Sequence, residues 1–339
     1  MKYRSWLIVP GNNEKRLGMT QGVGADVVVV DLSDTIPREG REIGCRLAAQ
    51  WLAASRSATN SHARPMARWV RINSFESGLW REDLAAVMPS APEGVILPKA
   101  TGPDAVRELA SEIYGYEERN GIVAGATRIM PVAGETAAAA LQIPRYLESA
   151  HQRLDGLAWS AGGLGAALGV RLRRDGQGAW GDACSFVRAQ VLLTAHAGGI
   201  RVVEAPFDHF EDEAGLERAA LRARGEGFTG MFAVHPAQVA VINRAFALGA
   251  GDMDEAREVV AAFAASPHLG SLAVAGRMVD RADLALAQNT LARHALAQNA
   301  GPQTSALQSH VPVERIAGSG INSGPLGEDT RRSVILRPA

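Results

Sequence analysis

Eight short apolar runs, each followed by a stretch with helical spacing, dominate the sequence up to residue 236. The runs cover 5–11, 25–34, 67–73, 94–100, 127–135, 154–161, 200–207 and 228–236. Continuous runs of valine, such as the one in "ADVVVVDLSD", are typical of strands that are buried on both faces of a parallel sheet. Eight strand–helix units in about 245 residues match the size of a (β/α)8 TIM barrel. We predict that fold, with a doubly wound sheet as the alternative.

The remaining residues divide into two parts. Helical patterns at 253–266 and 281–296 flank the short run "GSLAVAGRMVD". From about residue 298 the composition shifts to Gly, Ser, Pro, Asn and Gln without a sustained period, which is typical of irregular or disordered chain. We therefore predict a barrel over 1–247, a C-terminal helical extension or lid over 248–297, and an irregular or partly disordered tail over 298–339.

Charge and composition exclude several classes of partner. The chain has 35 basic and 36 acidic residues, so it lacks the excess positive charge of a nucleic-acid or membrane-surface protein. No apolar run approaches the roughly 20 residues that span a bilayer, and no signal peptide is visible. The two cysteines, Cys45 and Cys184, match no metal-binding spacing. These features predict a soluble protein of the reducing cytoplasm.

Polar side chains stand where the predicted strands end. The carboxyl ends of barrel strands converge on one mouth, which is where barrel enzymes place their active sites. The residues at these positions are Asp31, Asp34, Arg71, Asn73, Lys99, Glu135, His235 and Gln238. Carboxylates suit a hard cation, and an arginine suits a pair of anionic oxygens. The combination suits a carboxylated or carbonyl substrate on which negative charge develops during the reaction.

Several of these residues also have a purely structural interpretation. Arg71 can be an ion-pair partner inside the barrel. Glu135 can cap the helix that follows its strand, because acids are favoured at helix N-termini. Asp31 and Asp34 can brace a loop through hydrogen bonds to its backbone.

Further features have a plain alternative as well. His235 precedes a proline and can be a packing histidine, and Lys99 can form a salt bridge rather than a Schiff base. The acidic run at 207–213 is more typical of a solvated loop than of a metal cluster. The glycines of "LDGLAWSAGGLGAALGV" (154–170) miss the G-x-G-x-x-G spacing of a dinucleotide loop by one residue.

The order of six motifs resembles that of a known family. The motifs are "RSWLIVPGNNEKRL", "GADVVVVDLSDTI", "WVRINSFESGLWREDL", "GVILPKA", "GFTGMFAVHPAQVAVINRAF" and "GRMVDRAD". Together they are similar to the citrate lyase beta-subunit-like (CitE-like) branch of the HpcH/HpaI aldolase/citrate lyase family. The resemblance runs from residue 4 to about residue 295.

This resemblance implies a fold, an assembly and a reaction. The family implies a TIM barrel assembled as homo-trimers or hexamers, with a C-terminal helical extension exchanged between subunits. Its members are carbon–carbon lyases that cleave a CoA or acyl-carrier-protein thioester of a hydroxy di- or tricarboxylic acid, such as citryl-, malyl- or citramalyl-CoA. Mg²⁺ binds the 2-oxo or hydroxy acid portion.

The resemblance also implies roles for individual residues. By motif position, Arg71 is the substrate-binding and catalytic arginine, and Glu135 is the first metal-binding carboxylate next to the substrate. Asp280 corresponds to the catalytic aspartate that the extension offers to an adjacent subunit. His235 lies in the motif of the strand-eight loop, which we assign to substrate binding.

The sequence departs from the family pattern around the metal. Gly163 stands where the family has its second metal-binding aspartate, and Ser33 replaces a glutamate after the second strand. We therefore expect a weak or altered Mg²⁺ site on Glu135, with Asp34 and Asp31 as candidate support. The alternative is a catalytically impaired member that binds a CoA-like or dicarboxylate ligand, or a partner subunit, without turnover.

Overall fold

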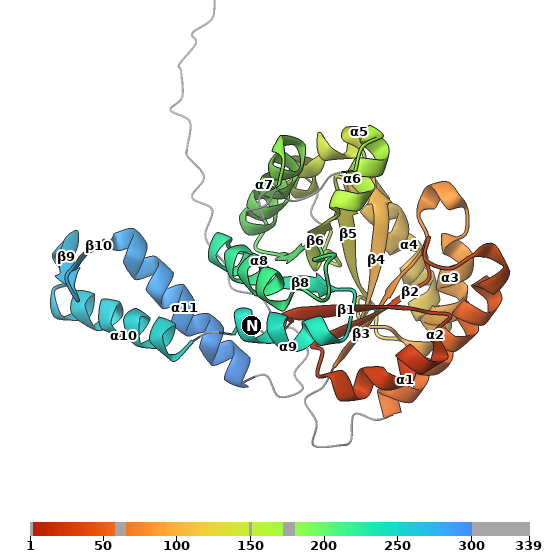
Figure 1. Cartoon of the computed structure of the whole chain (residues 1–339), viewed down its shortest axis with the longest axis horizontal. Coiled ribbons are helices and arrows are strands. Elements are labelled where there is room, and N and C mark those ends of the chain that lie inside the picture. Colours follow the sequence, from red (N-terminus) through yellow and green to blue (C-terminus); the bar gives the residue numbers. More distant parts are fainter. Residues whose placement is uncertain (1–2, 58–65, 149–150, 172–179, 248, 300–339) are drawn as a thin grey trace, which may run out of the picture. The chain divides into compact units, whose positions relative to one another are not determined.

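Eight parallel strands form a closed barrel in sequence order, and β8 pairs with β1 (Figure 1). The computed structural model describes residues 3–57, 66–148, 151–171, 180–247 and 249–299. The strands are β1 Ser5–Pro10, β2 Val27–Asp31, β3 Ala67–Arg71, β4 Gly94–Ala100, β5 Arg128–Ala133, β6 Gly156–Trp159, β7 Arg201–Glu204 and β8 Gly230–Ala233. Each lies within one of the eight predicted runs, so the TIM-barrel prediction is confirmed.

Helices connect successive strands and surround the barrel (Figure 1). The α-helices are α1 Glu14–Val23, α2 Arg41–Ser57, α3 Trp80–Val87, α4 Pro103–Arg119, α5 Ala137–Ala140, α6 Ala161–Leu168, α7 Asp182–Ala197, α8 Glu213–Glu226 and α9 Ala237–Ala245. Short 3-10 turns are η1 Arg38–Gly40, η3 Phe75–Ser77, η4 Met88–Ser90 and η5 Ile143–Leu147. No helix in the described ranges is long and apolar enough to cross a bilayer.

Strand β2 shows why the valine runs fold as barrel strands. Val27 and Val29 pack with the cluster that fills the barrel, whereas Val28 and Val30 pack against the outer helices. All four side chains are fully buried, so both faces of the strand need apolar residues. Because side chains alternate along a strand, Asp31 continues the inward face. The strand register places Asp31 opposite Arg71 at the end of β3.

Three aromatic side chains fill the barrel below this mouth. The ring of Trp6 meets those of Trp69 and Phe232 edge-on, at centroid distances of 5.0 and 6.2 Å. A Cβ atom at position 94 would lie 2.5 Å from the ring of Trp69. Gly94 therefore begins β4 because only a glycine leaves room for this ring.

A buried ion pair joins the C-terminal part of α4 to the segment before β6. Arg153 donates to both carboxylate oxygens of Glu117 at 2.7 and 2.6 Å, and both side chains are almost fully buried. Glu117 also accepts from the backbone amides of Gly125 and Thr127. Burial opposes the charged form, but the hydrogen bonds from Arg153, Thr127 and Gly125 hold the pKa of Glu117 below its ordinary value.

The C-terminal extension is a helical hairpin with its own small core. Helices α10 (Ala250–Ala265) and α11 (Arg281–Asn299) lie side by side and are joined by the antiparallel strands β9 (Ser271–Val274) and β10 (Arg277–Asp280) (Figure 1). Buried side chains from α10, β10 and α11 form its apolar cluster. The two-residue turn between the strands has positive φ at Ala275 (47°) and Gly276 (79°), as in the tight turns that favour asparagine and glycine.

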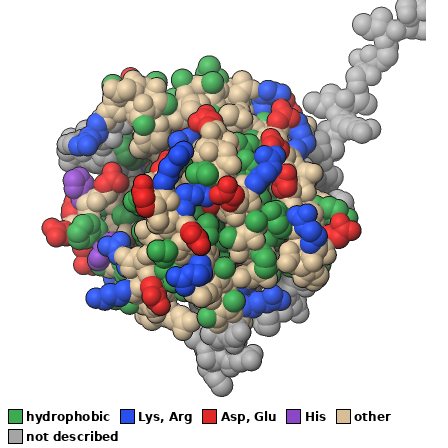
Figure 2. All heavy atoms as spheres, turned by 90° about the vertical axis from the view of Figure 1, so that its right-hand side faces the viewer, with side chains coloured by type: hydrophobic (Ala, Val, Ile, Leu, Met, Phe, Trp, Pro, Cys, Tyr) green, Lys and Arg blue, Asp and Glu red, His purple; other side chains and the backbone are tan. Residues whose placement is uncertain are grey.

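The structure refines some predicted boundaries. The strand expected over 154–161 ends at Trp159, and Gly163 lies in the first turn of α6 rather than in the strand. The helix expected over 281–296 runs to Asn299. Of the tail predicted over 298–339, residues 300–339 lie outside the described part of the chain. The face with α1 to α3 shows interspersed positive and negative side chains, as the balanced composition predicts (Figure 2).

Candidate active site at the barrel mouth

An ion pair between Arg71 and Asp31 forms the rigid part of the mouth. Nε of Arg71 donates to Oδ1 of Asp31 at 2.8 Å, and Nη2 donates to Oδ2 at 2.5 Å. Burial raises the pKa of Asp31, but the charge and hydrogen bonds of Arg71, with those of Ser33 and Thr35, hold it below its ordinary value. Burial lowers the pKa of Arg71, and the charge of Asp31 overcomes this and raises it. The guanidinium is therefore charged and fixed in orientation.

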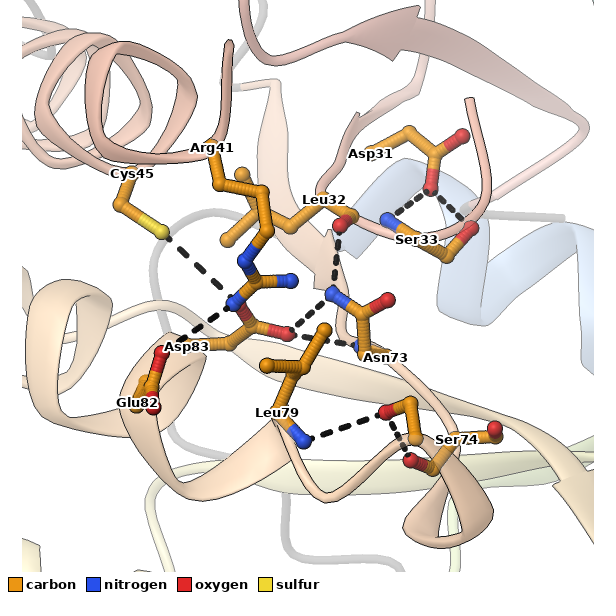
Figure 3. A network of polar contacts seen from close by, with 11 residues as sticks. Asp31, Leu32, Ser33, Arg41, Cys45, Asn73, Ser74, Leu79, Glu82 and Asp83 are labelled. Carbon is orange, nitrogen blue, oxygen red and sulfur yellow. Dashed lines mark hydrogen bonds and ion pairs between the residues drawn. The ribbon is translucent and has the colours of Figure 1, made fainter. Parts of the chain in front are cut away.

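Asp31 is fully occupied by protein donors. Besides Arg71, it accepts from the backbone amide and hydroxyl of Ser33 at 3.1 and 2.7 Å (Figure 3). It also accepts from the hydroxyl of Thr35 at 2.7 Å. A carboxylate offers about four lone-pair positions, and five donors already use them. The interpretation that Asp31 braces its loop is confirmed. It leaves this carboxylate no open position for a metal ion.

A second network, which the sequence analysis missed, braces the neighbouring loop. The buried carboxylate of Asp83 in α3 accepts from the backbone and side-chain amides of Asn73 at 2.8 Å each, and from Arg41 at 3.0 Å (Figure 3). Asn73 in turn donates to the carbonyl of Leu32 at 2.6 Å. Burial raises the pKa of Asp83 despite these hydrogen bonds. The network ties the loop after Arg71 to the loop after Asp31.

Glu135 follows β5 and is held at the mouth by the backbone of β4. Its Oε2 accepts the amide N–H of Lys99 at 2.5 Å. Burial raises the pKa of Glu135, and the Lys99 amide, the charges of Arg71 and Lys99, and a hydrogen bond from Ser160 partly oppose this rise. The structural alternative for Glu135, in which it caps the next helix, does not hold, because the hydroxyl of Thr136 caps α5 by accepting from Ala139 at 3.1 Å.

The Glu135 side chain occupies the space above Gly163. A Cβ atom added at position 163 would lie 2.9 Å from both Cγ and Cδ of Glu135 and would clash with its Oε1. Ser160 caps α6 by accepting from the Gly163 amide at 3.1 Å, and it also hydrogen-bonds Glu135. The position where the resemblance implies a second metal-binding carboxylate is therefore filled by the first one.

Lys99 and Asp34 complete the charged groups of the mouth. Nζ of Lys99 lies 3.4 Å from a carboxylate oxygen of Asp34, whose side chain is 79% exposed. The structure therefore shows Lys99 in a salt bridge, as its structural interpretation expects. The charges of Glu135 and Asp34 both act on Arg71, so these four groups share one electrostatic environment.

The loop that carries His235 is tied to the loop after β7. Gln238, which is buried, accepts from the amides of Val234 and His235 and donates to the carbonyl of Phe207 at 2.7 Å. The imidazole of His235 is half-buried and stacks on Phe210 at 4.8 Å between ring centroids. The structure thus shows a packing contact for His235, and no described contact joins it to Arg71 or Glu135.

Asp280 lies at the end of β10 and begins the last helix. Its Oδ1 accepts from the amides of Ala282 and Asp283 at 2.8 and 3.2 Å, and its own amide donates to Asp283 at 2.9 Å. This reciprocal arrangement is a helix cap. The catalytic role that the resemblance implies for Asp280 stays a prediction, since it concerns an adjacent subunit.

The donor set does not fit a magnesium ion as the side chains lie. Mg²⁺ demands near-octahedral oxygen ligands, usually with one or two protein carboxylates. Among the described residues, no group of three Asp, Glu, His or Cys side chains is arranged to hold a metal. Asp31 is saturated, position 163 has no side chain, and the carboxylate of Glu135 is held by Lys99 and Ser160.

Comparison with known proteins identifies the family of this chain. The model of the HpcH/HpaI aldolase/citrate lyase family matches residues 4–236, which is most of the chain. The chain belongs to the HpcH/HpaI aldolase/citrate lyase family. This confirms the resemblance on which Arg71 and Glu135 were assigned their motif positions.

Individual relatives place the chain in the CitE-like branch of this family. It is 28% identical to a (3S)-malyl-CoA thioesterase of Cereibacter sphaeroides over 296 residues, covering 86% of this chain and 94% of the relative. It is 29% identical to citrate lyase subunit beta of Escherichia coli, covering 82% and 88%. Protein CitE of Mycobacterium tuberculosis, solved with magnesium, acetoacetate and coenzyme A, has a TM-score of 0.67 and 27% identity, with 87% and 98% covered.

Proposed function

We propose that this protein is a carbon–carbon lyase that cleaves the CoA thioester of a hydroxy di- or tricarboxylic acid, such as citryl-, malyl- or citramalyl-CoA. The observation that carries the proposal is the orientation of Arg71 at the barrel mouth, fixed by Asp31 beside the carboxylate of Glu135. Relatives whose names specify malyl-CoA or citrate as substrate support this substrate class.

Arg71 has the donors that such a cleavage needs. Two of its five N–H groups go to Asp31, and no other side chain in the described ranges accepts from it. The remaining N–H groups can bind the oxygens of the acid fragment, including the hydroxyl oxygen, which carries negative charge once its proton leaves and before the carbon–carbon bond breaks. The bonding pair moves to the α-carbon of the thioester, and the hydroxyl of the acid fragment becomes a carbonyl.

The cleavage also needs two proton transfers. The hydroxyl proton must leave, and the enolate of the thioester must gain a proton to give acetyl-CoA or its homologue. We assign the first transfer to Glu135, which lies in the charge environment of Arg71. We assign the second to Asp280 of an adjacent subunit, which is the role that the family resemblance implies. His235 remains our candidate for contact with the substrate at the rim.

We also propose the character of the metal site, the assembly and the carrier of the acyl group. A magnesium site in this chain would be weak or altered, because it would rest on Glu135 with exposed Asp34 as the remaining candidate support. We propose a homo-oligomer, trimer or hexamer, in which the 248–297 extension serves a neighbouring subunit. Free acyl-CoA is the proposed substrate, with an acyl carrier protein as the second carrier, and we expect a cytoplasmic location.

A catalytically impaired, ligand-binding member is the second candidate function. The observation that favours it is that the Glu135 side chain occupies the space above Gly163, where the family resemblance implies a second carboxylate. Such a protein would bind a CoA-like or dicarboxylate ligand, or a partner subunit, without turnover.

Product analysis separates the two candidates. We expect malyl-, citramalyl- or citryl-CoA to yield an acyl-CoA and a 2-oxo acid, detected together by mass spectrometry. Arg71→Lys keeps the charge but loses the planar fork, and we expect turnover to fall by about 100-fold or more. Arg81→Lys, at an exposed pair with Glu108 and Glu112, is the matched control. Release of free CoA alone, or tight thioester binding without products, contradicts the lyase proposal.

A further inference from the structure

Lys99 has a backbone conformation that is rare for any residue except glycine. Its φ angle is +51°, and it lies in a bulge where the pairing of β4 with β5 shifts register between Leu97 and Ala100. A lysine in the left-handed region is strained, and such strain persists where the surrounding structure holds it. The backbone strain at Lys99 destabilises β4, but it places Lys99 at the mouth.

This conformation aims the two polar ends of Lys99 at different partners. The amide N–H points at Oε2 of Glu135 at 2.5 Å, and the ammonium lies 3.4 Å from Asp34. The amide holds the carboxylate of Glu135, whose side chain occupies the space above Gly163. Among the residues that the structure describes, the ammonium pairs only with the exposed carboxylate of Asp34, which is a weak pairing that a bound anion can replace.

Two cations therefore face the mouth, and they differ in chemistry. Arg71 presents a planar fork of which two donors are taken by Asp31. Lys99 presents a compact point charge on a flexible stem, with its side chain 37% exposed. A fork and a point charge together suit a carboxylate with a neighbouring oxygen, as in a 2-oxo or 2-hydroxy acid.

We propose that Lys99 supplies the positive charge that a divalent ion would otherwise supply here, so that Lys99 and Arg71 bind the acid end of the substrate without magnesium. The identity of that acid rests on the proposed function. Glu135 then serves as an internally held carboxylate, fixed by the Lys99 amide and Ser160, rather than as a metal ligand. Gly163 is the residue that makes this arrangement possible, since any larger residue displaces the Glu135 side chain.

Calorimetry of oxaloacetate binding to the full-length protein tests the proposal. We expect the same dissociation constant in a chelator and in excess Mg²⁺. Lys99→Gly accepts the positive φ and keeps the backbone amide but removes the ammonium, and we expect it to weaken binding by about 10–100-fold. Lys15→Ala, at an exposed position of α1, is the control and should bind as the unmodified protein does.

Chemical labelling of lysine amines tests the proposal on the unmodified protein, so no variant has to fold. The sequence has three lysines, Lys2, Lys15 and Lys99, among its 35 basic residues. We expect oxaloacetate in chelator to protect Lys99 from acetylation by an activated ester, measured by mass spectrometry relative to Lys15.

The outcomes separate this inference from the proposed function. Binding that appears only with Mg²⁺, or that leaves Lys99 as reactive as Lys15, overturns the inference and leaves the lyase proposal standing. Absence of oxaloacetate and acyl-CoA binding in both solutions overturns both. Binding in chelator with protection of Lys99 supports the inference even if no thioester is cleaved.

Discussion

Gly163→Asp is expected to convert the mouth into a two-carboxylate metal site. The new Cβ would lie 2.9 Å from Cγ and Cδ of Glu135, so the Glu135 side chain must rotate away. The atoms that must move are the far end of a flexible side chain, so the backbone can stay in place. The displaced Glu135 and the new aspartate would then offer the one or two carboxylates that Mg²⁺ usually takes from a protein.

The magnitude follows from the contacts that are exchanged. Losing the hydrogen bond from the Lys99 amide to the Glu135 carboxylate costs about 1.5–3 kcal/mol. Replacing a glycine in a helix by alanine stabilises the folded state by about 1 kcal/mol. Gly163→Ala is the matched control, because it displaces Glu135 without adding a ligand. We expect this control to lower the free energy of unfolding by about 0.5–2 kcal/mol.

Calorimetry with Mg²⁺ and urea unfolding measure the two effects. We expect Gly163→Asp to bind Mg²⁺ at least about tenfold more tightly than the unmodified protein. The alanine control should show no such gain. Equal Mg²⁺ affinity in the aspartate and alanine variants would refute the assignment of position 163 to the lost ligand. An alanine variant that unfolds at the same urea concentration as the unmodified protein would refute the placement of the Glu135 side chain in the space above Gly163.

Three further predictions concern stability and its pH dependence. Glu117→Gln breaks the buried pair with Arg153, and urea unfolding should show a loss of about 3–5 kcal/mol. Since the folded pKa of Glu117 lies below its ordinary value, this contribution is present at neutral pH and is lost as the pH falls below about 4, so the loss should shrink in acid. Asp31→Asn should lower the free energy of unfolding by about 3 kcal/mol, and it should weaken substrate binding because Arg71 is no longer held in one orientation. Unchanged substrate binding would contradict the role of Asp31 in orienting Arg71. Ala275→Asn should raise the free energy of unfolding by about 0.5–1 kcal/mol, because asparagine tolerates positive φ; a loss would contradict the turn geometry.

The sequence was sufficient to predict the barrel. Its β-branched runs must be buried on both faces, and β2 shows this directly with four fully buried valines. The positions of Arg71 and Glu135 at the mouth follow from the same reasoning, because both stand at or just beyond strand ends. Local pattern therefore predicted that Arg71 and Glu135 stand at the mouth, but it did not predict the Asp83 network that braces the neighbouring loop.

The contacts among these residues could not be predicted from sequence. The partner of Arg71 depends on the register between β2 and β3, which places Asp31 opposite it. A glycine at 163 indicates a missing ligand, but it does not say that Glu135 fills the space. The left-handed backbone of Lys99 has no signal in local sequence, since lysine rarely adopts it. Such features depend on tertiary contacts rather than on residue type.

A crystal structure of the protein soaked with a 2-oxo acid and Mn²⁺, with anomalous scattering recorded to locate the ion, tests the central claim most directly. The account predicts a 2-oxo acid whose oxygens contact Arg71 and Lys99, with Glu135 still bonded to the Lys99 amide and no anomalous peak beside it. An anomalous peak bound to Glu135, with that carboxylate rotated away from Lys99 and the acid held by the ion, would contradict it.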